Sequence, residues 1–271
     1  MNKIEGIIFD WAGTTVDFGC LAPVQAFVKS FQAAGLEVTL AEARAPMGLL
    51  KRDHIRAMLA MPRIKQLWES KHGRAADAHD VETIYACFEP LLLASLKMYT
   101  DPLPEVVQTV QLLRDAGLKI GSTTGYTDSM LEIVAAAAKP KGYAPDFRIT
   151  PDSTEAYGRP YPYMIFRNIE ALRLKAPHTV IKVGDTVADI QEGTNAAVWS
   201  VGVAIGSSQM GLGLGEYQLL SEAEKQKAVL AAESAFLSAG ADFTIASMKE
   251  LPDLVETIND LLQQGKKPGV K

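Results

Sequence analysis

The sequence predicts an α/β protein: a doubly wound parallel-sheet core with an inserted α-helical cap domain. Apolar blocks that end in small or polar residues occur at residues 5–10, 118–125, 180–186 and 199–203, as expected of buried parallel strands. Helical patterns alternate with these blocks, at residues 104–116, 128–138, 162–172 and 189–196. Because such sheets bind ligands at the carboxyl ends of their strands, we expect the polar residues after each block to converge there.

One long stretch departs from this alternation. Residues 21–99 carry helical patterns without a convincing strand, at residues 24–34, 40–45, 48–60, 64–69 and 81–97. We therefore predict two domains: a core of residues 1–20 and 100–271, and a helical cap of residues 21–99. Toward the C-terminus, helices at 219–238 and 250–263 flank a short strand at 243–245. The Gly-rich segment 210–215 is expected to be a surface loop.

Composition excludes several classes of function. The chain has 271 residues and a formal net charge of -5, and it has no basic run of the kind that nucleic-acid binding requires. It also has no window of about 18 uncharged apolar residues, so we expect no membrane span. Cys20 and Cys87 are too few for a disulfide framework. We expect a cytoplasmic protein that acts on a small molecule.

Three aspartates fall at or just after predicted strand ends. Asp10 follows the first strand, and Asp185 and Asp189 lie in the segment Gly184-Asp-Thr-Val-Ala-Asp. Converging carboxylates repel one another unless a cation lies between them, and oxygen ligands in a phosphate-handling site favour Mg²⁺. Taken singly, each acid could instead be a helix N-cap, Asp189 above all.

Four segments in order give the chain a resemblance to the haloacid dehalogenase superfamily of phosphotransferases: Asp10-Trp-Ala-Gly-Thr-Thr, Thr124, Arg159 and Gly184-Asp-Thr-Val-Ala-Asp. The resemblance implies that Asp10 is the nucleophile and becomes an aspartyl phosphate. It implies that Thr124 binds the phosphoryl group and that Arg159 replaces the usual lysine in neutralising charge. Asp185 would be a metal ligand, and Asp189 would support the metal directly or through water.

One position departs from the superfamily pattern. Most phosphatases of this superfamily carry a second aspartate two residues after the nucleophile, where it protonates the departing alcohol, and this chain has Ala12. A possible reason lies in the insert, where Met47, Lys51 and His54 are spaced to share one helical face. An arbitrary helical lysine is a solvated surface residue, but apolar neighbours favour a neutral amine, which can condense with an aldehyde.

This combination resembles the phosphonoacetaldehyde hydrolase (phosphonatase) family within that superfamily. Six segments carry the resemblance: Phe9-Asp-Trp-Ala-Gly-Thr-Thr-Val-Asp, Cys20, Pro46-Met-Gly-Leu-Leu-Lys, Gly121-Ser-Thr-Thr-Gly-Tyr-Thr, Gly158-Arg-Pro-Tyr-Pro and Lys182-Val-Gly-Asp-Thr-Val. The family implies a Schiff base on Lys51 and Mg²⁺ held by Asp10, the Ala12 carbonyl and Asp185. It also implies a homodimer joined through the caps.

Other residues match the lining of the family's site: Cys20, Met47, Gly48, His54 and Tyr126. His54 could shuttle protons, or it could be an ordinary helical histidine. Cys20 could be only a small buried residue at the hinge.

The resemblance implies hydrolysis of the phosphorus–carbon bond of phosphonoacetaldehyde to acetaldehyde and phosphate, with the cap closing as a lid. A phosphomonoesterase or phosphomutase on the same fold is the main alternative, and Ala12 argues against it. A catalytically silent phosphate sensor is a second alternative. A dinucleotide-binding dehydrogenase is disfavoured, because no G-x-G-x-x-G turn follows the first strand.

Overall fold

A six-stranded parallel sheet forms the centre of the larger of two bodies. The computed structural model describes residues 3–269, and the strand order is β3-β2-β1-β4-β5-β6. Its strands are β1 (Gly6–Phe9), β2 (Lys119–Ser122), β3 (Phe147–Arg148), β4 (Val180–Gly184), β5 (Trp199–Val203) and β6 (Phe243–Ile245). This confirms the predicted doubly wound α/β core. β3 was not predicted, because two residues carry no readable apolar pattern.

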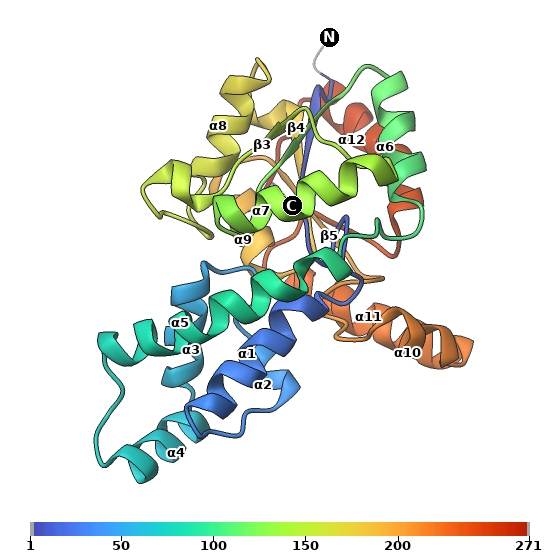
Figure 1. Ribbon diagram of the computed structural model, residues 1–271. Coiled ribbons are helices and arrows are strands. Elements are labelled where there is room, and N and C mark those ends of the chain that lie inside the picture. The colour runs from blue at the N-terminus through green and yellow to red at the C-terminus, as the bar shows by residue number, and fades with distance from the viewer. Residues whose placement is uncertain (1–2, 270–271) are drawn as a thin grey trace.

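Alternation along β1 distributes the core over both faces of the sheet. Ile7 and Phe9 belong to one buried cluster, whereas Ile8, between them, belongs to another. Helices therefore cover both faces (Figure 1). One face carries α6 (Val106–Asp115), α7 (Asp128–Ala138) and α12 (Leu251–Gln263), and the other carries α8 (Tyr163–Ala171), α9 (Val187–Asn195) and α11 (Glu222–Ser238). The short 3-10 helices are Leu96–Met98, Lys139–Lys141, Pro151–Thr154, Pro177–Thr179 and Met248–Glu250.

A second, all-helical body lies between β1 and β2 in the chain. It contains α1 (Leu21–Ala33), α2 (Leu40–Arg44), α3 (Lys51–Ala60), α4 (Pro62–His72) and α5 (Ala78–Ser95). Its centre is aromatic, since Phe27 of α1 stacks on Phe88 of α5 with ring centres 4.3 Å apart. Figure 1 shows this body beyond the end of the sheet, and we call it the cap. The exact domain boundaries at residues 20/21 and 99/100 stay predictions.

The two chain segments that join the bodies lie side by side. Val16 pairs with Pro102 in an antiparallel bridge, and the Leu103 amide donates a hydrogen bond to the Thr15 carbonyl (2.9 Å). α1 begins at this junction, where the Asp17 carboxylate accepts hydrogen bonds from the first amides of the helix, those of residues 21 and 22 (2.9 and 3.1 Å). The entry to the cap is therefore fixed to its exit.

Two predicted helices begin or end elsewhere. The helix predicted at 48–60 begins at Lys51, and Met47 lies in the preceding turn, so Met47 does not share a helical face with Lys51 and His54. The helix predicted at 219–238 is α11, which begins three residues later, at Glu222, because Ser221 caps it. Leu219 instead ends a separate short helix, α10 (Leu214–Leu219). The segment 210–215 is not simply a surface loop, since Gly213 is buried and Leu214 opens α10.

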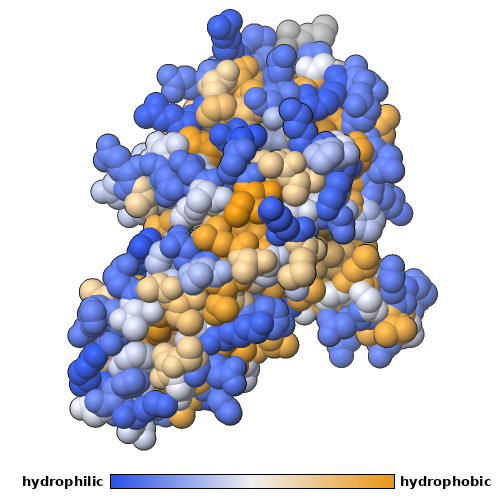
Figure 2. Space-filling model, in the orientation of Figure 1, coloured by the Kyte–Doolittle hydropathy of each residue, from blue (hydrophilic) through white to orange (hydrophobic). Residues whose placement is uncertain are grey.

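The surface of the described chain is mostly hydrophilic at its outer ends. Figure 2 shows apolar residues gathered along the waist where the cap meets the sheet body. Among residues 3–269, no helix is long and apolar enough to cross a bilayer.

Candidate active site

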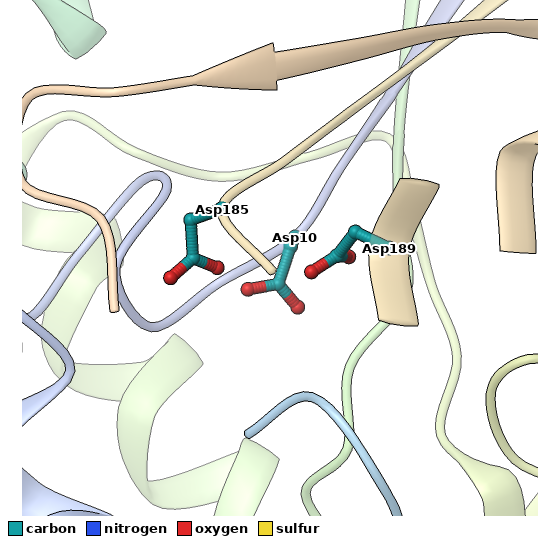
Figure 3. Close-up of side chains that lie close together, drawn as sticks. All are labelled: Asp10, Asp185 and Asp189. Carbon is teal, nitrogen blue, oxygen red and sulfur yellow. The ribbon is translucent and has the colours of Figure 1, made fainter. Parts of the chain in front are cut away.

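The predicted carboxylates meet at the carboxyl end of the sheet. Asp10 and Asp185 directly follow the neighbouring strands β1 and β4, and the Asp10 amide donates to the Val183 carbonyl (3.0 Å). Asp189 lies in the first turn of α9. Carboxylate oxygens of Asp10, Asp185 and Asp189 lie within 4.8 Å of one another, and all three residues are buried. Figure 3 shows the Asp185 and Asp189 carboxylates on either side of Asp10.

The close approach of these carboxylates disfavours the ionised form of Asp185. Burial raises the pKa of Asp185 well above its ordinary value, and the nearby charges of Asp10 and Asp189 raise it further. Two donors partly compensate: the Ser208 amide, 2.7 Å from Oδ2, and the Thr14 hydroxyl, 3.2 Å from Oδ1. A bound cation would favour the ionised form, so this carboxylate is suited to be a metal ligand.

Asp189 has a different environment. Burial alone would raise its pKa, but Arg159 and Lys182 outweigh burial and hold the pKa of Asp189 below its ordinary value. Lys182 Nζ lies 2.8 Å and Arg159 Nη2 3.0 Å from Oδ1, and the Thr186 hydroxyl donates to Oδ2 (2.6 Å). Thr186, rather than Asp189, is the N-cap of α9. Oδ2 of Asp189 thus accepts a hydrogen bond, whereas Oδ1 has two cationic neighbours but accepts no hydrogen bond from the described residues.

Arg159 reaches the site from the loop before α8. Its Nη2 donates to Asp10 Oδ1 (2.5 Å) and to the Thr123 hydroxyl (2.9 Å), while its Nε donates to Glu192 Oε2 (3.0 Å). The guanidinium side chain is 1% exposed. Arg159 therefore pairs directly with Asp10. Its role in neutralising charge on a phosphoryl group stays a prediction.

Three members of this charge cluster were not predicted from the sequence: Thr123, Lys182 and Glu192. Lys182 lies in β4, and its Nζ donates to the Thr123 hydroxyl (3.1 Å). Glu192 lies in α9, one turn after Asp189, and accepts from the same hydroxyl (3.0 Å). A lysine inside an apolar strand block is a detectable signal, because lysine is rarely buried without a partner. Glu192 offered no such signal.

The buried charges of this cluster do not cancel. Asp10, Asp185, Asp189 and Glu192 carry four negative charges when ionised, and Arg159 and Lys182 carry two positive charges, which leaves two negative charges. A single divalent cation would balance them. The donor set consists of oxygens, so these residues fit a hard cation.

A pocket between the cap and the sheet connects these groups. Its free volume is small, about 20 Å³. Ten predicted site residues line it: Asp10, Ala12, Cys20, Met47, Gly48, Lys51, Thr124, Tyr126, Arg159 and Asp185. Pro23, Gly125 and Thr186 complete the lining. The side chain at position 12 is a methyl group here, so the position beside Asp10 offers no proton donor.

Lys51 brings an amine from the cap into this pocket. It is the first residue of α3 and is 4% exposed. Its Nζ lies 5.1 Å from the centre of the Tyr126 ring and 5.9 Å from the centre of the Phe27 ring. Burial lowers the pKa of Lys51 below its ordinary value. The neutral, nucleophilic form of the amine is thereby favoured.

Two predicted residues lie outside the pocket lining: Asp189 and His54. The His54 ring is fully buried and stacks on Phe27 with centres 3.7 Å apart, and its Nε2 bonds the Ala43 carbonyl (2.9 Å). Burial and the nearby Lys51 charge hold the pKa of His54 well below its ordinary value. A proton-shuttling role for His54 stays a prediction. Cys20 lines the pocket, and burial raises the pKa of its thiol well above the ordinary value.

Comparison with known proteins places the chain in a family. A family model for haloacid dehalogenase-like hydrolases matches residues 4–197. The chain is 54% identical to the phosphonoacetaldehyde hydrolase of Lysinibacillus sphaericus over 96% of its own length and 97% of that protein's. It belongs to the phosphonoacetaldehyde hydrolase family. The relative from Bacteroides fragilis is 49% identical over 97% of this chain and 99% of its own.

A solved structure agrees with this assignment. The crystal structure of a phosphonoacetaldehyde hydrolase-like protein from Oleispira antarctica superimposes with a TM-score of 0.94 and 38% identity, covering 98% of this chain and 96% of that one. This superposition includes both the sheet body and the cap, so the structural likeness to that protein is not confined to the sheet body.

In this member of the phosphonoacetaldehyde hydrolase family, a glycine allows the cap to approach the sheet closely. Gly48 has φ 93°, and a Cβ added there would lie 2.3 Å from the Thr186 hydroxyl. On the opposite side, a Cβ on Gly125 would lie 2.8 Å from the Leu49 carbonyl oxygen. The closed pocket therefore depends on the absence of side chains at this contact.

Gly48→Ala should loosen the closed arrangement, because the added methyl group would clash with Thr186. We expect the buried Cys20 thiol to react with a disulfide reagent about tenfold faster, equivalent to roughly 1.4 kcal/mol of easier opening. The labelling rate of each cysteine, measured by mass spectrometry, checks this.

Two controls separate this contact from general damage. Cys87, a partly buried cysteine of α5 that does not line the pocket, should keep its labelling rate. Gly73→Ala imposes a similar positive φ (68°) where no described atom lies within 4 Å of the new Cβ, so it should leave Cys20 protected. Equal effects of the two glycine variants would contradict the role given to Gly48.

Proposed function

We propose that this chain hydrolyses the phosphorus–carbon bond of phosphonoacetaldehyde, giving acetaldehyde and inorganic phosphate. The observation that carries the proposal is the juxtaposition of a buried lysine amine with a carboxylate–arginine pair in one small pocket. An imine-forming group and a phosphoryl acceptor are the two functions that this reaction needs. The near full-length identity to relatives of that name supports the same activity.

The first step uses Lys51. Its neutral amine adds to the aldehyde carbon, water leaves, and the resulting imine becomes an electron sink once protonated. Burial of the amine supports this step, since it favours the form with a free electron pair. Tyr126, Met47, Gly48 and Cys20 would surround the bound aldehyde, as their positions in the pocket suggest.

The second step uses Asp10. A carboxylate oxygen attacks phosphorus, the phosphorus–carbon bond breaks, and its electron pair moves toward the iminium nitrogen to give an enamine. Arg159 would neutralise charge on the transferring group, and Thr124 would donate a hydrogen bond to it. No alcohol oxygen departs, which explains why Ala12 can replace an acid. The enamine carbon then takes up a proton, which regenerates an iminium ion on Lys51. Water adds to this iminium ion and releases acetaldehyde and the free amine, and a second water releases phosphate from Asp10.

Mg²⁺ is the proposed metal. Asp10, the Ala12 carbonyl and Asp185 would hold it, and the excess of two buried negative charges supports a divalent ion. When bound, it supplies positive charge that lets a phosphoryl dianion approach a carboxylate. The ion pairs of Asp189 with Lys182 and Arg159 support an indirect role for that residue at the metal, through water.

Phosphate release tests the whole assignment. Purified protein with Mg²⁺ should release phosphate from phosphonoacetaldehyde, and removal of the metal with EDTA should lower the rate by at least about 100-fold, with recovery on adding Mg²⁺ back. A colorimetric phosphate assay measures both. Faster release from ordinary phosphate esters would instead favour a phosphomonoesterase or phosphomutase. Tight phosphonate binding without turnover would favour a sensor.

Lys51→Arg should abolish the imine step, because the guanidinium stays protonated and cannot condense with an aldehyde. Borohydride added with substrate should give a reduced adduct on Lys51 in the parent protein and none in the variant, with turnover lowered by at least about 1,000-fold. Peptide mass spectrometry locates the adduct. Lys65→Arg, at an exposed position on α4, is the matched control and should keep full activity. Undiminished turnover by Lys51→Arg would falsify the proposed mechanism.

A homodimer joined through the caps stays a prediction. Light scattering should give twice the chain mass, and Leu67→Glu, an exposed apolar position on α4, should reduce that mass if the cap is the contact. The sheet body offers a competing surface, an exposed aromatic cluster of Tyr157, Tyr161, Tyr163 and Phe166. Dissociation by Tyr163→Glu alone would move the interface there.

A further inference from the structure

The Thr123 hydroxyl, which was not predicted as part of the site, is a hydrogen-bond junction between three charged side chains near Asp10. A hydroxyl can donate one hydrogen bond and accept two. Thr123 accepts from Arg159 Nη2 (2.9 Å) and from Lys182 Nζ (3.1 Å), and donates to Glu192 Oε2 (3.0 Å). Both cations can only donate and the carboxylate can only accept, so the direction of every bond at this hydroxyl is fixed.

This junction holds the Arg159 guanidinium at two points. Nε donates to Glu192, and one hydrogen of Nη2 points to Thr123. The guanidinium is planar, so these two bonds fix its orientation, and the second Nη2 hydrogen points at Asp10 Oδ1. The aim of Arg159 at Asp10 therefore depends on Glu192 and Thr123.

Lys182 keeps a second acid, Asp189, from drawing Arg159 away from Asp10. Asp189 Oδ1 lies 3.0 Å from Arg159 Nη2, close enough to attract the guanidinium away from Asp10. Lys182 Nζ lies nearer to the same oxygen, at 2.8 Å, and 3.5 Å from Glu192. It offsets the negative charge of both acids, which leaves Arg159 free to pair with the nucleophile.

We propose that Lys182 and Glu192 are positioning residues that hold Arg159 against Asp10 and so set the rate of phosphoryl transfer, without acting in imine formation. Neither residue lines the pocket. Lys51 lies on the cap and contacts neither of them, so the two steps are separable. This inference rests on the proposed function.

The geometry favours positioning over stability as the reason for these charges. Buried charges are expensive to desolvate, and replacing a buried pair by neutral groups of similar size is often neutral or stabilising. Lys182 and Glu192 side chains are at most 1% exposed. If this pair were purely structural, replacing both residues by neutral ones would leave the rate of phosphoryl transfer unchanged.

The charge-balanced double variant Lys182→Met/Glu192→Gln tests the proposal, because it removes one positive and one negative charge together. We expect kcat for phosphonoacetaldehyde to fall by about 10- to 100-fold with KM changed less than about threefold. Borohydride trapping at Lys51 should keep the parent rate, and the thermal midpoint should change little. Phosphate release, adduct mass and thermal unfolding are the three readouts.

A matched control and a second variant complete the test. Lys175→Met/Glu5→Gln removes a lysine–glutamate pair at the surface, whose Nζ–Oε1 distance is 2.6 Å, and should leave all three readouts unchanged. Thr123→Val keeps the side-chain shape but removes the junction hydroxyl, so it too should lower kcat and leave trapping intact. It also decides the question if the double variant does not fold.

The outcomes separate this inference from the proposed function. Parent-like kcat in the folded double variant or, if that variant does not fold, in Thr123→Val would overturn the positioning role. So would a proportional loss of trapping at Lys51. If the parent protein itself gave neither adduct nor phosphate, the proposed function would fail first.

Discussion

Repulsion among buried carboxylates is the interaction around which the rest of this site is arranged. Asp10 and Asp185 must lie together, because they end neighbouring strands of one parallel sheet. Burial makes their mutual repulsion stronger than it would be in water. Two fixed cations, Arg159 and Lys182, offset part of the charge, and the remainder creates a place for a divalent ion. Without that ion, the excess negative charge would repel an anionic phosphonate.

The cap supplies the other group that the proposed mechanism needs, a lysine amine without its proton. An imine needs an amine that has lost its proton, and a lysine loses it readily only when water is excluded. α3 begins at the pocket and places Lys51 there, while Gly48 and Gly125 let the two bodies touch closely enough to bury it. In the proposed mechanism, the cap therefore supplies the group that reacts with carbon, and the sheet body supplies the groups that react with phosphorus.

Much of this arrangement could be predicted from the sequence, because the functional residues of a parallel sheet lie just after the carboxyl ends of its strands. Asp10, Asp185 and Thr124 follow apolar blocks, and the pocket contains ten of the residues expected there. The local sequence pattern gave wrong or incomplete predictions where contacts between distant segments determine the structure. It extended the helix before Lys51 into a turn and gave Met47 a helical face. It missed Lys182 and Glu192, whose role is visible only once a strand and a helix are packed together. The alternative reading of Asp189 as a helix N-cap does not hold, because Thr186 is the N-cap of α9.

The paired junction between the two bodies limits how the site can open. Because the outgoing and returning chain segments are bonded to each other at Val16 and Pro102, they cannot slide or twist independently. The first helix of the cap starts directly after this junction, at Leu21. In the proposed lid movement, the pivot therefore lies where the two connecting segments are paired, at the base of the cap.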